Sequence, residues 1–264
     1  DDLEVIVDPF KVCVVNNLLD DKEILLKVRE EFDEIEWNKR SLDLYEFFQS
    51  KDLKDVNSYY ISCVYEFLKS EVKNWIQSLT ELELTNISAT CSLYGFTDYL
   101  LVHDDRQEDR AIAFVLYFTG PAGWDCDKGG ALQLYSKDNT GEPLNIVRNI
   151  YPHHNQFVFF PVTNNSYHQV EEIIHKNDSR MSINGWFHIK NPLIFDDPVC
   201  KFPKSGLFSN NFRTPQKCNL NLEEWIDTEY LQAATAASIQ QQIEDESEIS
   251  LCHFFKIDVW RNVL

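Results

Sequence analysis

The chain has 264 residues, of which 44% are hydrophobic and 13% aromatic. This composition supplies enough apolar surface for a sizeable core and excludes a disordered chain. Lys and Arg number 24 against 43 Asp and Glu, a net charge of −19, so we expect no direct nucleic-acid partner, because such binding requires cations that neutralise phosphates. No apolar run approaches the ~20 residues of a membrane helix, so we expect a soluble protein with no membrane partner. An acidic surface attracts a basic partner instead.

Seven cysteines are scattered through the sequence without a CxxC pair. Structural zinc held by paired thiolates is therefore not expected. Scattered single cysteines are typical of a reduced compartment, which predicts a cytoplasmic and/or nuclear protein. A partial set of disulfides is the alternative.

Residues 1–80 are expected to contain one strand followed mostly by helices that brace a sheet. Residues 10–15 are apolar and β-branched, which is typical of a strand. Asp20 or Asp21 can cap a first helix. A second helix with a cap at residues 57–58 carries apolar side chains at helical spacing, which we expect to pack against the sheet.

Residues 81–195 show a different pattern, in which short aromatic and β-branched runs alternate with turn signals. Eight strands are predicted, at residues 87–94, 99–103, 111–118, 131–135, 145–150, 156–160, 166–171 and 180–188. This spacing favours a double-sheet jelly roll or a barrel, and helices before it favour an α+β arrangement. Residues 196–264 are predicted to form a linker and an acidic helical segment at 225–248.

The sharpest chemical signal is the run His103-Asp104-Asp105 at the end of a predicted strand. Strand residues two apart point the same way, so His103 and Asp105 can converge on one ion. A second histidine would complete the two-His-one-carboxylate face that is diagnostic for a non-heme Fe(II) oxygenase. A lone His-x-Asp is weak evidence, however, and a surface histidine beside solvated carboxylates is the alternative.

The remaining histidines are candidates for the third ligand: His153, His154, His168, His175, His188 and His253. We favour His168, which begins a strand directly after the turn at residues 163–165, because this places it at the mouth of the sandwich. Arg180 opens the last predicted strand and shares a face with Trp186. A lone Arg inside a barrel needs a partner because burying an unpaired charge is costly. A co-substrate carboxylate matches the guanidinium fork, and an internal Asp or Glu is the alternative.

The constellation of His103-x-Asp105, His168 and Arg180, with Gly129-Gly130 ahead of the next strand, resembles the 2-oxoglutarate and Fe(II)-dependent prolyl hydroxylases. Further segments resemble most closely the catalytic N-terminal half of the eukaryotic ribosomal prolyl 3-hydroxylases: residues 43–47, 101–105, 129–135, 167–170, 179–188 and 225–231. That family carries a second, non-catalytic double-stranded β-helix, and we expect residues 196–264 to lead to such a domain.

The resemblance implies that residues 81–195 form a catalytic double-stranded β-helix of the jelly-roll, cupin-like kind, braced by the N-terminal helices of residues 1–80. It implies Fe(II) bound by His103, Asp105 and His168, with 2-oxoglutarate as co-substrate and ascorbate as a stimulant. The resemblance also assigns the co-substrate pocket: Arg180 and Tyr117 anchor the far carboxylate, Tyr94 approaches the co-substrate, Leu132 walls the pocket, and Trp186 packs over the iron region.

The activity that the resemblance implies is hydroxylation of a prolyl residue at C3, coupled to decarboxylation of 2-oxoglutarate to succinate. The implied substrate is a decoding-centre protein of the small ribosomal subunit, so the reaction affects translation. Ribosomal proteins are basic, which matches a net charge of −19. Three alternatives stay open: a prolyl hydroxylase of another protein such as a transcription factor, a catalytically silent scaffold, and nucleic-acid demethylation by the same iron chemistry.

Overall fold

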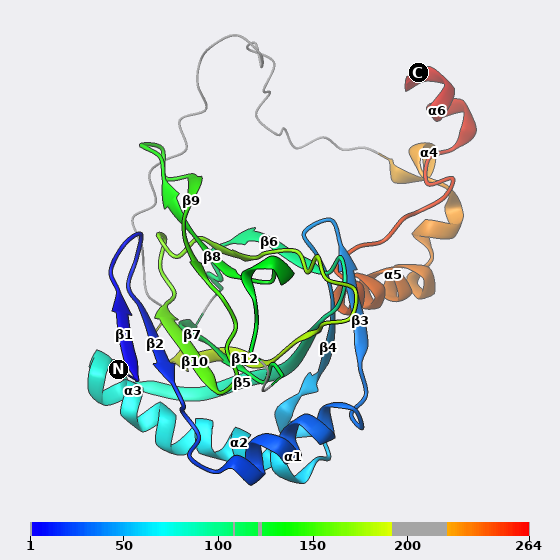
Figure 1. The fold of residues 1–264 in the computed structure, drawn as a ribbon. Coiled ribbons are helices and arrows are strands. Elements are labelled where there is room, and N and C mark those ends of the chain that lie inside the picture. Colours follow the sequence, from blue (N-terminus) through cyan, green and yellow to red (C-terminus); the bar gives the residue numbers. More distant parts are fainter. Residues whose placement is uncertain (1, 108, 121–122, 192–220, 264) are drawn as a thin grey trace. The chain divides into compact units, whose positions relative to one another are not determined.

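The structure is a computed structural model that describes residues 2–107, 109–120, 123–191 and 221–263. The chain divides into two compact units, Asp1–Cys200 and Lys201–Leu264. The first unit combines helices with a single curled antiparallel sheet (Figure 1). Within the described ranges, no helix is both long enough and apolar enough to cross a bilayer.

Twelve strands build the sheet of the first unit. They are β1 (Leu3–Ile6), β2 (Val12–Asn16), β3 (Asn38–Leu42), β4 (Tyr45–Asp52), β5 (Leu84–Tyr94), β6 (Tyr99–His103), β7 (Arg110–Tyr117), β8 (Leu132–Lys137), β9 (Pro143–Ile150), β10 (Gln156–Pro161), β11 (His168–Val170) and β12 (Arg180–Ile189). All eight strands predicted between residues 81 and 195 are present, with ends within three residues of the prediction. Their aromatic and β-branched composition was therefore sufficient to predict these strands.

The strand order is β1-β2-β10-β7-β12-β5-β4-β6-β11-β8-β9, with β3 paired to β4. Along this order the sheet curls over, so that β6, β8 and β9 lie across from β7, β10 and β12 (Figure 1). This closed arrangement is the double-stranded β-helix, which confirms the expected fold class. Both histidines of the expected metal site lie on β6 and β11, which are neighbours in the sheet.

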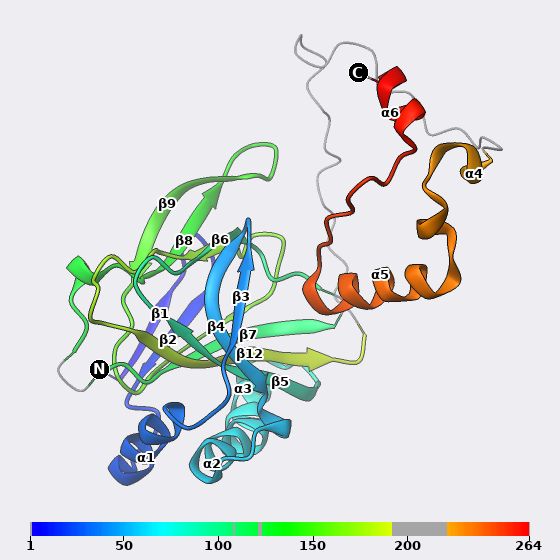
Figure 2. The ribbon, with the colours of Figure 1, turned by 90° about the vertical axis from the view of Figure 1, so that its right-hand side faces the viewer.

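Three helices cover the outer face of the sheet: α1 (Lys22–Phe32), α2 (Tyr59–Phe67) and α3 (Lys73–Thr80), with a π-helical turn at Leu68–Val72 joining the last two (Figures 1 and 2). Their buried side chains form one cluster with the outward-facing residues of the sheet, among them Val28, Ile61, Ile76, Phe114 and Phe187. Asp21 caps α1 by accepting the backbone N–H groups of Glu23 and Ile24, a contact worth about 1 kcal/mol. The helices therefore brace the sheet as predicted.

The N-terminal region contains more strand than the sequence indicated. Residues 1–80 were expected to be mostly helical after one strand, and this was wrong for β1, β3 and β4. β3 and β4 form a hairpin in which no residue of β3 is buried, so the sequence shows no alternation of apolar and polar residues there. These strands form because β4 pairs with β5 and β6, which are distant in sequence, and no local pattern records such pairing.

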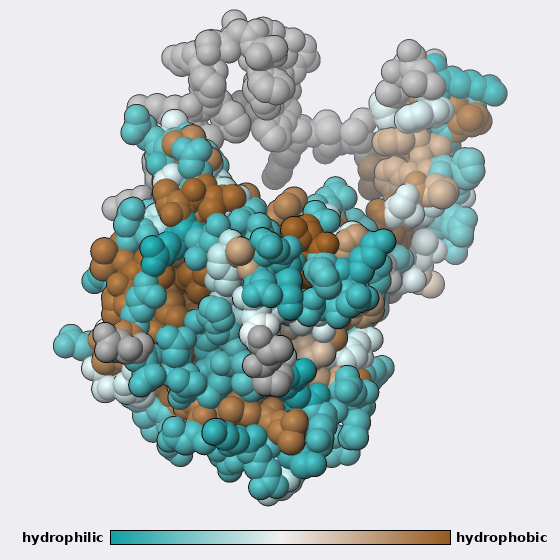
Figure 3. Space-filling view, in the orientation of Figure 1, coloured by the Kyte–Doolittle hydropathy of each residue, from teal (hydrophilic) through white to brown (hydrophobic). Residues whose placement is uncertain are grey.

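The inner face of the curl is lined by a second set of buried side chains: Val12, Val14, Ala113, Val115, Tyr117, Leu132, Leu134, Val158 and Phe160, with Trp186 packed against them. The outer surface is mostly hydrophilic in the view of Figure 3, apart from apolar patches. Some of the exposed apolar side chains lie on the edge strands β1 and β9, among them Leu3, Val5, Leu144 and Ile146. The core thus lies on both faces of one sheet, with the polar site residues set into the inner one.

The second unit is helical, with α4 (Leu222–Trp225), a 3₁₀ turn at Thr228–Leu231, α5 (Ala233–Glu246) and α6 (Ile257–Val263). The acidic helix predicted at 225–248 is therefore interrupted, because the backbone is extended at Ile226 and again at Gln232. Ile226 forms a bridge with Phe255 instead of continuing the helix. Most of the expected linker, residues 196–220, lies outside the described residues.

Candidate metal and co-substrate site

His103 and His168 are cross-strand neighbours on β6 and β11, and their ring centroids lie 4.2 Å apart. Each ring is fixed by the backbone two residues before it: Nδ1 of His103 contacts the carbonyl oxygen of Leu101 at 2.8 Å, and Nδ1 of His168 contacts that of Ser166 at 2.7 Å. A carbonyl oxygen only accepts, so Nδ1 carries the proton in each neutral ring. Both Nε2 atoms are therefore left with a lone pair for a metal.

Asp105 follows the end of β6 and brings its carboxylate to both histidines. Its Oδ1 lies 3.5 Å from Nε2 of His103, and its Oδ2 lies 3.4 Å from Nε2 of His168. One ligand atom from each residue lies within 4.8 Å of the others. Two imidazoles and one carboxylate on one side of an ion are the donor set of a non-heme Fe(II) site. The backbone of Asp105 is left-handed, with φ of 64°.

The electrostatics of this cluster suit a divalent cation. Burial, reinforced by the neighbouring His168, lowers the pKa of His103 to about 4, so its ring is neutral at pH 7. Burial opposes the negative charge of Asp105, but the hydrogen bond and charge of His168 outweigh it and hold the pKa of this carboxyl below its usual range. Burial likewise opposes the charge of His168, yet Asp105 raises its pKa. The cluster therefore presents a carboxylate and a neutral imidazole.

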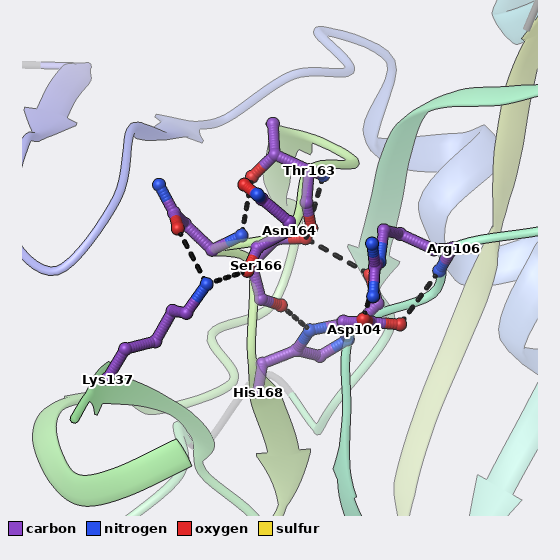
Figure 4. A network of polar contacts seen from close by, with 8 residues as sticks. Asp104, Arg106, Lys137, Thr163, Asn164, Ser166 and His168 are labelled. Atoms are coloured by element: carbon purple, nitrogen blue, oxygen red, sulfur yellow. Dashed lines mark hydrogen bonds and ion pairs between the residues drawn. The ribbon is translucent and has the colours of Figure 1, made fainter. Parts of the chain in front are cut away.

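The segment that carries Asp105, here called the ligand loop (residues 104–107 and 109), is held at its start by a polar network (Figure 4). The hydroxyl of Ser166, which is fully buried, lies between the carbonyl oxygens of Thr163 at 2.9 Å and Asp104 at 3.0 Å and shares its proton between them. The carboxylate of Asp104 accepts from Arg106 at 2.7 Å, and Lys137 donates to Asn165 at 3.0 Å at the other side of the network. The network thus links the residue before Asp105 to the strand that carries His168.

Two side chains that the sequence analysis did not pair flank Asp105. The guanidinium carbon of Arg110 lies 3.5 Å from the centroid of the Trp186 ring, and Nη1 of Arg110 lies 4.0 Å from Oδ1 of Asp105. The indole of Trp186 also helps to lower the pKa of Asp105, although its buried Nε1 has no partner of ordinary hydrogen-bond geometry. The structure therefore places Trp186 next to Asp105, together with the guanidinium of Arg110. The sequence did not indicate this pair, because it depends on the register between β7 and β12.

Arg180 lies inside the curl, where its residue is 2% exposed. Its Nη2 donates to the hydroxyl oxygen of Tyr117 at 3.1 Å, and its guanidinium lies 5.0 and 4.8 Å from the rings of Tyr94 and Tyr117. Its Nε is buried without a hydrogen-bond partner. Tyr117 accepts from Arg180, so its own hydroxyl proton remains for another acceptor. An orphaned guanidinium N–H beside a free O–H matches a carboxylate, and no internal Asp or Glu pairs with Arg180 among the described residues.

Space for this arrangement depends on Gly130, which has a φ of 75°. A Cβ there would lie 2.5 Å from Cδ1 of Ile173 and 3.4 Å from Cδ of Arg180. Leu132 follows and lies in the inner cluster with Tyr117 and Trp186, whereas Tyr94 stacks on Phe47 with ring centroids 4.7 Å apart. Burial raises the pKa of the Tyr94 hydroxyl, so this group stays protonated. The residue pattern therefore fits both an iron ion and a dicarboxylate.

Comparison with known proteins places these observations in a family. Residues 89–188 match the family model described as the 2OG-Fe(II) oxygenase superfamily. This range begins in β5, ends in β12, and includes every ligand of the metal cluster. Residues 89–188 therefore form a 2OG-Fe(II) oxygenase domain, and the iron and 2-oxoglutarate expected from the sequence are confirmed as the cofactors of this class of domain.

Several curated relatives are proteins named prolyl 3-hydroxylases. The chain is 36% identical over 260 residues to prolyl 3-hydroxylase sudestada1 of Drosophila melanogaster, covering 96% of this chain and 48% of that protein. It is 35% identical over 262 residues to prolyl 3-hydroxylase OGFOD1 of Mus musculus, covering 97% and 46%. The chain spans about half the length of the curated relatives it matches. The resemblance seen in the sequence is thus confirmed.

The solved structures agree on the fold. A prolyl-4-hydroxylase from Pseudomonas putida superposes with a TM-score of 0.56 at 17% identity, covering 68% of this chain and 92% of that chain. At this identity the likeness shows the double-stranded β-helix alone. The assignment of roles to individual side chains therefore depends on the geometry described above.

Proposed function

We propose that the chain is the catalytic half of a 2-oxoglutarate- and Fe(II)-dependent hydroxylase that modifies C3 of a prolyl residue in a small-subunit ribosomal protein of the decoding centre. The observation that carries the proposal is the His103, Asp105 and His168 cluster, which lies inside a chain 36% identical to a protein named prolyl 3-hydroxylase. A catalytically silent scaffold has no need of three converging ligand atoms and a buried Arg with an orphaned N–H. These features therefore favour an enzyme.

His103, Asp105 and His168 would hold the Fe(II), each histidine through the Nε2 lone pair that its backbone contact leaves free. Arg180 and Tyr117 would bind the carboxylate of 2-oxoglutarate remote from the metal, because their unmet donors both suit an anion. Tyr94 and Leu132 would wall the co-substrate, and Trp186 would cover the metal region.

Bound Fe(II) with 2-oxoglutarate and oxygen supplies the oxidising chemistry, in which 2-oxoglutarate loses carbon dioxide to give succinate and a prolyl C–H becomes C–OH. The chain's own contribution is orientation and exclusion of water. The inner apolar cluster keeps the pocket dry, and the backbone contacts of the two histidines fix their rings before any ligand binds. Ascorbate would act as a stimulant without a binding group of its own.

The substrate part of the proposal is supported by charge. A net charge of −19 attracts a basic protein and speeds its encounter by about 10- to 1,000-fold at low salt. We therefore expect kcat/KM on a basic ribosomal protein to fall at least about tenfold between ~50 and ~300 mM salt, because exposed charges are screened within a Debye length of about 10 Å or less. A short uncharged prolyl peptide is the control and should show little change. Equal salt dependence of the two substrates would remove the electrostatic argument.

The activity itself is tested by mass spectrometry. Purified small-subunit ribosomal proteins are incubated with the chain, Fe(II), 2-oxoglutarate and ascorbate, and the products are scored for a gain of one oxygen and mapped to a residue. A 3-hydroxyprolyl product in one basic protein supports the proposal. Succinate release without any ribosomal product, or a product in a transcription-factor peptide only, contradicts the proposed substrate.

The same proposal places the protein in the cytoplasm and/or nucleus, where ribosomal proteins are made and assembled. The cysteines that the structure describes, Cys13, Cys63, Cys91, Cys126 and Cys252, are all free thiols, which suits a reduced compartment. Imaging of a tagged full-length protein tests this placement, and retention in the secretory pathway would contradict it.

A further inference from the structure

Beside the metal site, three polar side chains form an array with no role in the proposed chemistry. Nδ1 of His188 lies 2.8 Å from Oδ1 of Asp109, and Nε2 of His188 lies 2.7 Å from Oγ of Ser88. The carboxylate of Asp109 only accepts, so in the neutral ring Nδ1 donates to it and Nε2 accepts from the Ser88 hydroxyl. His188 is 9% exposed, and its two contacts, both partly buried, hold the ring in one orientation.

The array reaches the metal site through the ligand loop, of which Asp109 is the last residue. The start of this loop is held by the contact between Ser166 and the carbonyl of Asp104. Its end is held to β12 twice: the backbone N–H of Ile189 donates to the carbonyl of Asp109 at 2.9 Å, and His188 binds the Asp109 side chain. Asp105 lies between these two anchored ends.

The loop needs such anchors because the backbone of Asp105 is left-handed. A non-glycine residue keeps a positive φ only where its surroundings impose it. The strand pairing around His188 is also irregular. The pairing of β12 with β7 shifts between Phe187 and His188, and that of β12 with β5 shifts between Phe187 and Ile189. Such irregularities re-aim side chains next to active sites. Here the irregularity coincides with the ring of His188 being directed at both Asp109 and Ser88.

The same anchor fixes the neighbour of Asp109. Arg110 is the cross-strand partner of His188, and its guanidinium stacks on Trp186 at 3.5 Å while facing Asp105. A displacement of Asp109 therefore moves the end of the ligand loop and the Arg110–Trp186 pair together. Both of these flank the carboxylate that completes the metal cluster.

We propose that His188 is a positioning residue, which tethers Asp109 and thereby holds Asp105 in the orientation that meets His103 and His168. The inference rests on the metal site of the proposed function, but it does not depend on which protein is hydroxylated. Residues that orient a metal ligand change metal affinity by about 10- to 100-fold when they are replaced. His188 acts one step further from the ion, so we expect an effect near the lower end, about tenfold.

The experiment measures Mn(II) affinity from the electron paramagnetic resonance signal of the free ion, on the whole chain without 2-oxoglutarate or substrate. Two variants of His188 separate its two contacts. The amide of Asn lies near the position of ring Nδ1 and can still donate to Asp109, whereas the amide of Gln lies near Nε2 and can reach only Ser88. We expect His188→Gln to weaken Mn(II) binding about tenfold, and His188→Asn to stay close to the parent. Ser88→Ala, which removes one hydrogen bond of the same array without touching the tether, is the matched control and should also stay close.

A second variant keeps the test decisive if the His188 variants lose stability. Asp109 has a side chain 44% exposed, so Asp109→Ala should fold, and it should weaken Mn(II) binding as much as His188→Gln does. The double variant should be no worse than either single one, because both remove one tether. Parent-like affinity in Asp109→Ala, equal losses in His188→Gln and Ser88→Ala, or additive losses in the double variant would each overturn the proposal. These results are independent of hydroxylation, so failure of the proposed substrate would leave them unchanged.

Discussion

Replacing Arg180 by Met gives the sharpest test of the co-substrate pocket, because the two explanations of this residue predict opposite results. Arg180 is almost fully buried, yet its only described hydrogen bond is to Tyr117, and its Nε is unsatisfied. If the pocket binds a dicarboxylate, the ligand-free protein carries an unpaired cation. If an internal carboxylate balanced it, removing the Arg would strand a buried negative charge. Met retains much of the length and apolar volume of the side chain.

The magnitudes follow from these contacts. Removing an unsatisfied buried donor gains about 1–3 kcal/mol, and losing two cation–π contacts costs about 0.5–2 kcal/mol each. These terms offset, so Arg180→Met should change ligand-free stability by between a gain of about 2 and a loss of about 3 kcal/mol, whereas a stranded buried charge would cost about 3–5 kcal/mol. In the parent, 2-oxoglutarate at 100 times its Kd adds about 2.7 kcal/mol. For a folded unit of this size that is a rise in Tm of roughly 5–10 °C, and the variant should show none.

The assay is thermal unfolding with Mn(II), with and without 2-oxoglutarate, on the parent and on Arg180→Met. Arg148→Met is the control, because Arg148 pairs with Glu4 on the surface with both side chains about half exposed, a contact worth at most about 1 kcal/mol. The control should keep the full rise in Tm. A rise of parental size in Arg180→Met, or a loss of more than about 3 kcal/mol without ligand, would refute the assignment of Arg180 to the co-substrate.

Three further predictions follow from the same pocket. Gly130→Ala should lower the free energy of unfolding by about 1–3 kcal/mol, because its φ of 75° is strained for Ala. It should also reduce the Tm rise with 2-oxoglutarate by crowding Arg180. Urea unfolding measures the first effect and the thermal assay the second, and parental values would contradict the packing described. Ser166→Ala should weaken Mn(II) binding about tenfold by freeing the start of the ligand loop, whereas the control Ser136→Ala should not. Equal Mn(II) affinities of the two variants would show that the contact of Ser166 with Asp104 does not support the metal site. Tyr117→Phe should raise the Kd of 2-oxoglutarate about 10- to 100-fold, the loss of one hydrogen bond to a charged group, as measured by calorimetry; an unchanged Kd would exclude the tyrosine from the anchor.

The strands of the core could be predicted because each reports its environment locally. The run from Arg110 to Tyr117 is apolar on both faces, and it lies in the middle of the curled sheet, covered on both sides. β3 could not be predicted, because Lys39 and Arg40 carry no alternation and the strand exists through its pairing with β4. Local pattern therefore predicts strands that bury side chains, and it misses strands held by the backbone alone.

The residues of the site likewise fall into those that the sequence predicts and those that it does not. The sequence predicted His103, Asp105, His168 and Arg180. The strand alternation expected to bring His103 and Asp105 together does not apply, because β6 ends at His103 and Asp105 has a left-handed backbone. Ser166 carried a weak signal, since it lies two residues before a ligand. The link between Asp109 and His188 had none, because it requires the irregular register of β12 against β7. Asp109 and His188 meet only in the folded chain, so no spacing in the sequence predicts their contact.

The left-handed backbone at Asp105 restricts which amino acids can serve as the acidic ligand. Among side chains that bind metals through oxygen, Asp and Asn enter this region of backbone space far more readily than longer or branched residues. Asn keeps the conformation but gives up the negative charge, and Glu keeps the charge but enters this backbone region less readily and has a longer reach. Only one of the twenty amino acids meets both demands, so substitutions that exchange one acid for another should be as damaging here as outright removal of the carboxylate.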